Sequence, residues 1–164
     1  MKRSSLKEKC DCVGDFQPRS EGKKKDIVAS YMYPTEEALK QKQTRSIIQE
    51  IQAGLLIQEL NVFQRTLNVA MERLIPMLGI SKATFHRRKE AGRLGADESD
   101  KLIRYARLTG KAIEVLEGIE NARAWLLSPQ HGLGGEIPFE YAKTEIGARE
   151  VEDLLNRIEY GVYT

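Results

Sequence analysis

Several residue types and patterns that define common protein classes are scarce or absent in this chain of 164 residues. Its two cysteines, Cys10 and Cys12, are too few and too close together for a disulfide framework. No apolar run approaches the roughly 20 residues that span a bilayer, and the start, MKRSSLKEKCDC, lacks the apolar centre of a signal peptide. We therefore expect a cytoplasmic protein with no membrane partner.

Patterns typical of catalytic and metal sites are also missing. His86 and His131 are the only histidines, and no Cys, Asp or Glu stands at a metal-ligand spacing from either. The stretch Gly132-Leu133-Gly134-Gly135 lacks both the strand of a dinucleotide fingerprint and the Lys-Ser/Thr of a phosphate loop. We expect no enzyme activity, no cofactor and no metal, and a small helical enzyme that uses carboxylates near His131 stays open as an alternative.

Apolar residues recur at helical spacing along most of the chain. With 41% hydrophobic residues the chain can bury a core, and no segment alternates with the two-residue period of a strand. The sequence therefore predicts an all-α fold. Two stripes carry this prediction most clearly: Leu56, Leu60, Phe63 and Leu67, and then Val151, Leu154, Leu155 and Ile158.

Two positions predict interruptions in the helical pattern. Pro76 lies within an apolar segment, where a missing backbone donor predicts a kink or an early end of the helix. Thr109-Gly110 predicts a break in the helix that begins around Asp97. The first 25 residues or so show no recurring apolar stripe, and we expect residues 1–43 to form a mobile basic tail.

The two signs of charge are segregated along the chain. From Ile113 to Thr164 four basic residues stand against ten acidic ones, although the net charge of the whole chain is +2. The part before Ile113 therefore carries an excess of about eight positive charges. Because a basic part attracts a polyanion and an acidic part repels one, the sequence predicts two parts with different partners, one of them nucleic acid.

Residues 78–93 have the features of a helix-turn-helix. Leu78-Gly79-Ile80-Ser81 has the length and the glycine of the turn, and Ser81 is suited to cap the helix that follows. Residues 82–93 carry a net charge of about +4, which favours DNA binding over the alternative of a solvated helix in an ordinary bundle. The candidate DNA-contacting residues are Ser81, Lys82, Thr84, His86, Arg87, Arg88, Lys89 and Arg93.

The same stretch resembles the MbcA/ParS/Xre-type antitoxins that accompany RES-domain toxins. Residues 79–88, GISKATFHRR, are similar to the turn and recognition helix of that family, and residues 92–94 and 97–100 continue the likeness. The resemblance covers about residues 46 to 164. In the acidic part it rests on Ala122, Ala124, Trp125, Leu126, Leu133, Gly134, Gly135, Pro138, Thr144, Gly147, Val151, Leu155, Gly161 and Val162.

The resemblance implies a bacterial type II antitoxin with two functional parts. Residues 44–110 would form an Xre-like helix-turn-helix domain that binds operator DNA and autoregulates the operon. Residues 111–164 would form a helical toxin-binding domain that covers the active site of a cognate RES-domain toxin, which consumes NAD or uses it for ADP-ribosylation. The alternative is a stand-alone transcription regulator whose C-terminal domain serves dimerisation.

The C-terminal residues are the candidate contacts to the toxin. Terminal aromatic side chains beside a flexible glycine make good interface anchors, although they could also pack on their own domain. A homodimer is expected because helix-turn-helix proteins commonly pair to contact two half-sites. The candidate toxin-binding residues are Tyr160, Gly161, Val162, Tyr163 and Thr164.

Overall fold

The computed structural model of the chain describes residues 27–33 and 44–162. Within these ranges the fold is all-α, as the sequence predicts, and no helix is long and apolar enough to cross a membrane. The helices are, in chain order, α1 (Ile27–Met32), α3 (Thr44–Ala53), α4 (Ile57–Leu67), α5 (Met71–Met77), α6 (Lys82–Ala91), α7 (Ala96–Val115), α8 (Ile119–Leu127), the 3-10 helix η1 (His131–Leu133), α9 (Pro138–Tyr141) and α10 (Glu145–Glu159).

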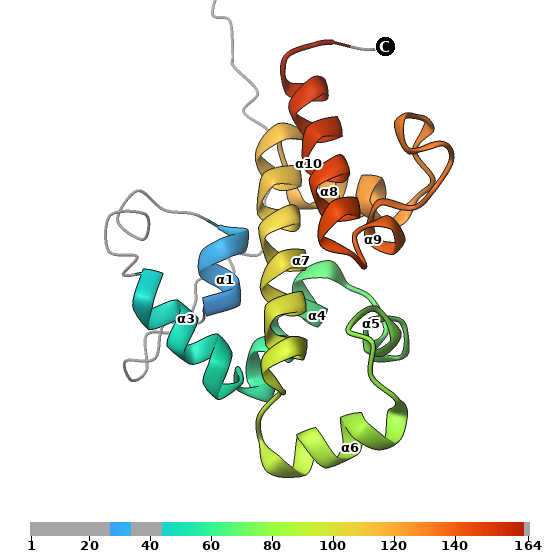
Figure 1. Cartoon of the computed structure of the whole chain (residues 1–164). Helices are drawn as coiled ribbons and strands as arrows, with labels where there is room; N and C mark the ends of the chain where they lie inside the picture. The colour runs from blue at the N-terminus through green and yellow to red at the C-terminus, as the bar shows by residue number, and fades with distance from the viewer. Residues whose placement is uncertain (1–26, 34–43, 163–164) are drawn as a thin grey trace, which may run out of the picture.

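Helix α7 is the axis of the molecule (Figure 1). Helices α1 and α3 lie on one side of it and α10 on the other, while α6 lies beyond its N-terminal end. Half of the 20 residues of α7 are buried, so its neighbours enclose it on most sides. The predicted domain boundary between residues 110 and 111 falls inside this helix, which is therefore shared by the two predicted domains.

The predicted break at Thr109-Gly110 was wrong, because α7 runs through both residues. A β-carbon at Gly110 would lie 2.2 Å from the backbone oxygen of Tyr31 in α1. The glycine therefore permits the close approach of α1 and α7, and this packing offsets the low helix propensity of glycine. At the other predicted interruption, α5 contains Pro76 and continues to Met77, and the turn at Gly79 closes it, since the amide of Ile80 donates to the backbone oxygen of Ile75.

A helix also forms where the sequence predicted only a tail. Helix α1 lies within residues 1–43, and its Val28 and Met32 are fully buried against the core. The side chain of Glu59 in α4 accepts hydrogen bonds from the backbone amides of Ile27 and Val28, both at 2.9 Å. Because an isolated six-residue helix is unstable in water, α1 depends on these distant contacts, which local sequence does not reveal.

The remainder of the predicted tail, residues 1–26 and 34–43, lies outside the described residues, and so do Cys10 and Cys12. The prediction that these segments are mobile stays a prediction.

One hydrophobic core extends across both predicted domains. Phe139 of α9 packs edge-on against Tyr105 of α7, with ring centroids 5.4 Å apart, and lies 6.4 Å from Phe63 of α4. Burial raises the pKa of Tyr105 to about 12, so its hydroxyl stays protonated and donates to the backbone oxygen of Met77 at 3.3 Å. Side chains from residues far apart in the chain thus complete the same core.

Candidate nucleic-acid and protein interfaces

The turn between α5 and α6 has the construction that the sequence predicts. Gly79 has a φ of +74°, a conformation that glycine adopts without strain. The hydroxyl of Ser81 accepts a hydrogen bond from the backbone amide of Thr84 at 3.1 Å, which confirms the predicted cap. Gly92, with a φ of +72°, ends the helix. Helix α6 therefore starts and stops where its own sequence dictates.

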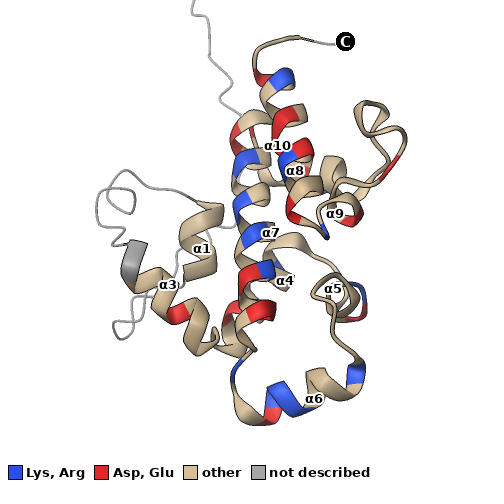
Figure 2. Ribbon diagram, viewed as in Figure 1, with Lys and Arg blue, Asp and Glu red and all other residues tan. Residues whose placement is uncertain are grey.

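Helix α6 is exposed along its length, since none of its residues is buried. Phe85 is half-buried and packs against the core, which makes it the apolar anchor of the helix. In Figure 2 several stretches of the α6 ribbon are coloured as Lys or Arg. An exposed, capped, cationic helix after a tight turn has the properties that insertion into the major groove of DNA requires.

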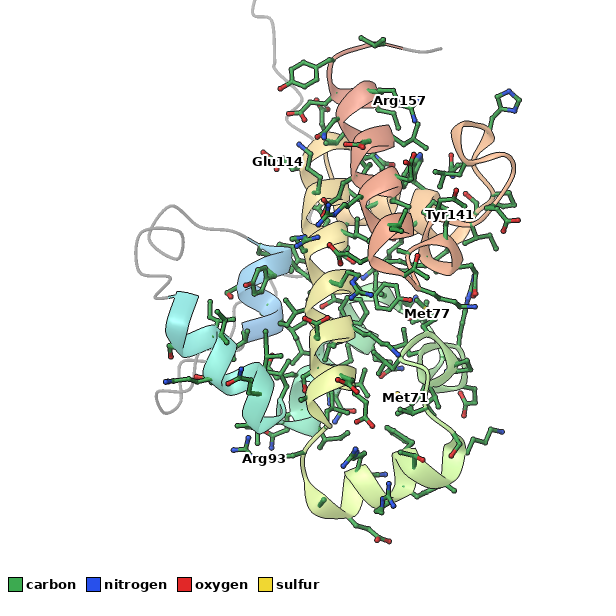
Figure 3. The ribbon with its side chains drawn as sticks, viewed as in Figure 1. Met71, Met77, Arg93, Glu114, Tyr141 and Arg157 are labelled. Atoms are coloured by element: carbon green, nitrogen blue, oxygen red, sulfur yellow. The ribbon has the colours of Figure 1, made fainter. Side chains whose placement is uncertain are left out.

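Three of the candidate DNA-contacting residues border one open cavity of about 470 Å³ between α4, α5 and α6. Lys82, His86 and Lys89 follow each other at spacings of four and three residues, so they share the face of α6 that carries Phe85. Met71 of α5 lies on the other side of the cavity (Figure 3). The three side chains reach solvent, and the cavity places them beside apolar surface.

The three candidate arginines differ in whether their side chains are hydrogen-bonded within the chain. Arg87 is exposed on α6 and does not line the cavity. Arg93, beyond the end of α6 (Figure 3), donates from Nη1 to the backbone oxygen of Gly54 at 2.7 Å. Arg88 donates from Nε to both carboxylate oxygens of Glu98, at 3.0 and 3.1 Å. Of these three residues, Arg88 is the one whose charge is balanced within the chain.

Glu98 is a residue whose role the sequence analysis missed. Its carboxylate accepts a hydrogen bond from the backbone amide of Gly95 at 2.6 Å. Its position three residues after the N-cap is the spacing of a capping box, and that signal could have identified it. The pairing with Arg88 depends on the fold and has no local signal.

A row of ion pairs connects α7 to α10. Arg104 pairs with Glu145 at 2.9 Å and Arg107 with Glu152 at 2.8 Å, and basic residues of α7 lie beside acidic residues of α10 in Figure 2. The amino group of Lys111 hydrogen-bonds Glu159, and this bond raises the pKa of Lys111 above its usual value. Some basic residues of the first part of the chain are therefore paired with acidic residues of the second part within the folded molecule.

The C-terminal end of α10 presents candidate contact residues to solvent. Tyr160 is 77% exposed and Val162 is 53% exposed. Gly161 has a φ of +66°, and the amide of Val162 donates to the backbone oxygen of Arg157 at 2.9 Å, so the chain turns sharply after the helix. Tyr160 is therefore available for an intermolecular contact. Tyr163 and Thr164 lie outside the described residues.

The other residues considered for chemistry are dispersed. His131 opens η1 with an exposed side chain, on the loop between α8 and α9. Among residues 27–33 and 44–162 no group of three His, Cys, Asp or Glu side chains is placed to hold a metal ion.

These features define a class of protein: a helix-turn-helix with an exposed cationic second helix, joined through a shared helix to a small acidic α-helical domain. Comparison with protein families agrees with this description in both parts. Residues 46–107 match the antitoxin Xre-like helix-turn-helix domain. Residues 111–161 match the antitoxin Xre/MbcA/ParS C-terminal toxin-binding domain. The chain therefore belongs to the Xre/MbcA/ParS antitoxin family, as the motifs of the sequence suggested.

Three similar proteins are each named Antitoxin Xre. The protein of Yersinia enterocolitica is 28% identical over 120 residues, which are 72% of this chain and 81% of that protein. The protein of Photorhabdus laumondii is 33% identical over 91 residues, 54% of this chain and 62% of the relative. The protein of Pseudomonas putida is 35% identical over 68 residues, 42% of this chain and 43% of the relative.

Proposed function

We propose that this protein is a type II antitoxin that neutralises a cognate RES-domain toxin and represses its own operon. The observation that carries the proposal is the presence, in one chain and in order, of a match to the antitoxin helix-turn-helix domain and a match to the toxin-binding domain. The protein acts by binding, in the bacterial cytoplasm, and needs no cofactor of its own.

Toxin neutralisation is assigned to the C-terminal part. The toxin consumes NAD or uses it for ADP-ribosylation, and the antitoxin covers its active site. The exposed side chains of Tyr160 and Val162 support this assignment, because exposed apolar groups at a chain terminus gain free energy when a partner buries them. Tyr163 and Thr164 extend the same contact. The anchoring of Glu159 by Lys111 holds the end of α10 on the body of the molecule.

Operator binding is assigned to α6 and its flanking turns. The exposed cations Lys82, Arg87 and Lys89 support it, since each phosphate contact releases counterions from DNA. The hydroxyls of Ser81 and Thr84 lie at the start of the helix, where they and the free amides face a phosphate. We infer a homodimer in this complex, because paired helix-turn-helix units contact two half-sites about one helical turn apart.

The test is co-expression with the adjacent gene, scored by growth. The full chain is expected to restore growth to cells poisoned by the adjacent gene product, and a chain ending at Glu159 is expected to fail. The control is Arg87→Gln, which leaves the C-terminal part unchanged and is expected to restore growth fully. Thermal melting of the truncated chain checks that its fold is retained.

Two outcomes would contradict the proposal. Full rescue by the chain ending at Glu159 would show that Tyr160–Thr164 are not needed for the contact with the toxin. A neighbouring gene product that neither poisons cells nor co-purifies with the chain would favour the stand-alone regulator, in which the C-terminal domain only dimerises.

A further inference from the structure

Burial does little to fix the orientation of α6. None of its residues is buried, and an open cavity of about 470 Å³ lies between it and the helices α4 and α5. Phe85 is the large apolar side chain by which α6 packs against the core, and it lines the cavity together with Ile57 of α4 and Ile75 of α5. A helix that enters a DNA groove must nevertheless be held at a defined angle, because base and phosphate contacts depend on its position. The structure must therefore supply another constraint.

The carboxylate of Glu98 supplies one such constraint by joining α6 to α7, in addition to the backbone hydrogen bond that Ile57 donates to Gly92 at the end of α6. The side chain of Glu98 is only 9% exposed and accepts from Nε of Arg88 with both oxygens. One of the same oxygens accepts from the backbone amide of Gly95, immediately before α7. Helix α7 is the enclosed axis of the molecule, so this link holds the C-terminal half of α6 in a defined position relative to α7.

Gly95 makes room for the link. A β-carbon at this position would lie 2.7 Å from Nη2 of Arg88 and 3.3 Å from Cδ of Glu98. The φ of Gly95 is −75°, an ordinary value for any residue, so its backbone conformation does not require glycine. The space for the guanidinium is the feature that a side chain here would remove.

We propose that Arg88 and Glu98 are positioning residues for DNA recognition and that Arg87, beside Arg88, makes the direct phosphate contact. The proposal rests on the operator binding proposed above. Arg88 already pairs with Glu98, so moving its guanidinium away onto a phosphate would leave a nearly buried carboxylate without its charged partner, and such separation is costly. The two adjacent arginines therefore have different roles, although they look equivalent in the sequence.

The test measures Kd for a duplex that carries the promoter region of the gene for this chain, over a series of NaCl concentrations. The variants are Arg88→Gln, Glu98→Gln and Gly95→Ala, each in the full chain, with Arg87→Gln as the matched control. Gly95→Ala changes no charge, and its added methyl group meets only the side-chain ends of Arg88 and Glu98 and no backbone atom among its nearest contacts. It therefore keeps the test valid if Arg88→Gln lowers the melting temperature.

The three variants of the link are expected to weaken binding by about tenfold, the effect of losing one charge-assisted interaction. Their slope of log Kd against log NaCl is expected to match that of the wild type, because no phosphate contact is removed. The control Arg87→Gln is expected to lower the slope by about one. Arg88→Gln combined with Glu98→Gln is expected to cost no more than either change alone.

Opposite results distinguish the failure of this proposal from that of the proposed function. If Arg88 contacts phosphate directly, Arg88→Gln lowers the slope by about one, and Glu98→Gln and Gly95→Ala leave binding unchanged or tighten it by freeing the guanidinium. That outcome overturns the positioning role alone. Absence of wild-type binding to the promoter duplex overturns operator binding and the positioning role together.

Discussion

Buried polar side chains of this protein act as connectors between segments that are distant in the chain. Glu59 holds the start of α1 and Glu98 holds the end of α6, and both carboxylates are buried. Ser99 accepts a hydrogen bond from the backbone amide of Leu55 and so connects α7 to the segment between α3 and α4. Among the described residues no buried side-chain polar atom lacks a partner, as expected where each unpaired group would cost free energy.

Glu59→Ala is the residue-scale prediction. It leaves the amides of Ile27 and Val28 without their acceptor, so the free energy of unfolding is expected to fall by about 2 kcal/mol. Urea unfolding measures the change, and hydrogen exchange at the two amides is expected to accelerate more than elsewhere. The control Glu50→Ala, on the exposed side of α3, is expected to stay within about 0.5 kcal/mol of the wild type. Equal effects of the two substitutions would contradict the role of Glu59.

At the scale of the helix, local sequence accounts for some elements and not for others. The predicted apolar stripes place α4 and α10 correctly, and the cap at Ser81 places the start of α6, because these signals lie within the elements or directly beside them. The sequence analysis missed α1, whose N-terminus is satisfied by a residue about 30 positions away. The wrong prediction at Gly110 has the same origin, because the close approach of the Tyr31 backbone leaves no room for a side chain at this position.

The pairing of α7 with α10 provides the element-scale prediction. Acidic residues of α10 recur every seven residues at Glu145, Glu152 and Glu159, a spacing that keeps them on one helix face. Arg107→Glu would place two carboxylates together and is expected to lower the free energy of unfolding by about 0.5 kcal/mol, a modest effect because the pair is partly exposed.

The matched experiment is the charge swap. Arg107→Glu combined with Glu152→Arg restores opposite charges and is expected to recover most of the loss, measured by urea unfolding in low salt. High salt is expected to reduce the difference between the variants, since it screens the pair. A double variant no more stable than Arg107→Glu alone would show that this ion pair does not contribute.

At the scale of the whole molecule, the two family domains are not independent bodies. Helix α7 crosses the boundary between them, and Phe63, Tyr105 and Phe139 pack together from both sides. Proposed DNA and toxin contacts thus lie on α6 and at the end of α10, on a common framework (Figure 1). A shared core implies that both parts unfold in one cooperative transition.

Phe63→Ala tests this cooperativity. The substitution removes a fully buried ring in the helix-turn-helix part and is expected to cost about 3 kcal/mol or more. The fluorescence of Trp125, the single tryptophan, reports on α8 in the other part. Its unfolding midpoint in urea is expected to shift together with the midpoint seen by circular dichroism. A Trp125 transition that keeps its wild-type midpoint would show that the two parts unfold separately.

The amino-acid sequence was sufficient for the fold class, for most helices and for the family, because apolar period, capping residues and the residue order around Gly79–Arg88 are local properties. Tertiary packing alone assigned different surroundings to Arg87 and Arg88, made α1 a helix and neutralised much of the basic side of α7. The reason is physical: the free energy of a charged side chain or of a short helix depends on the groups around it, and folding brings those groups together from distant parts of the chain.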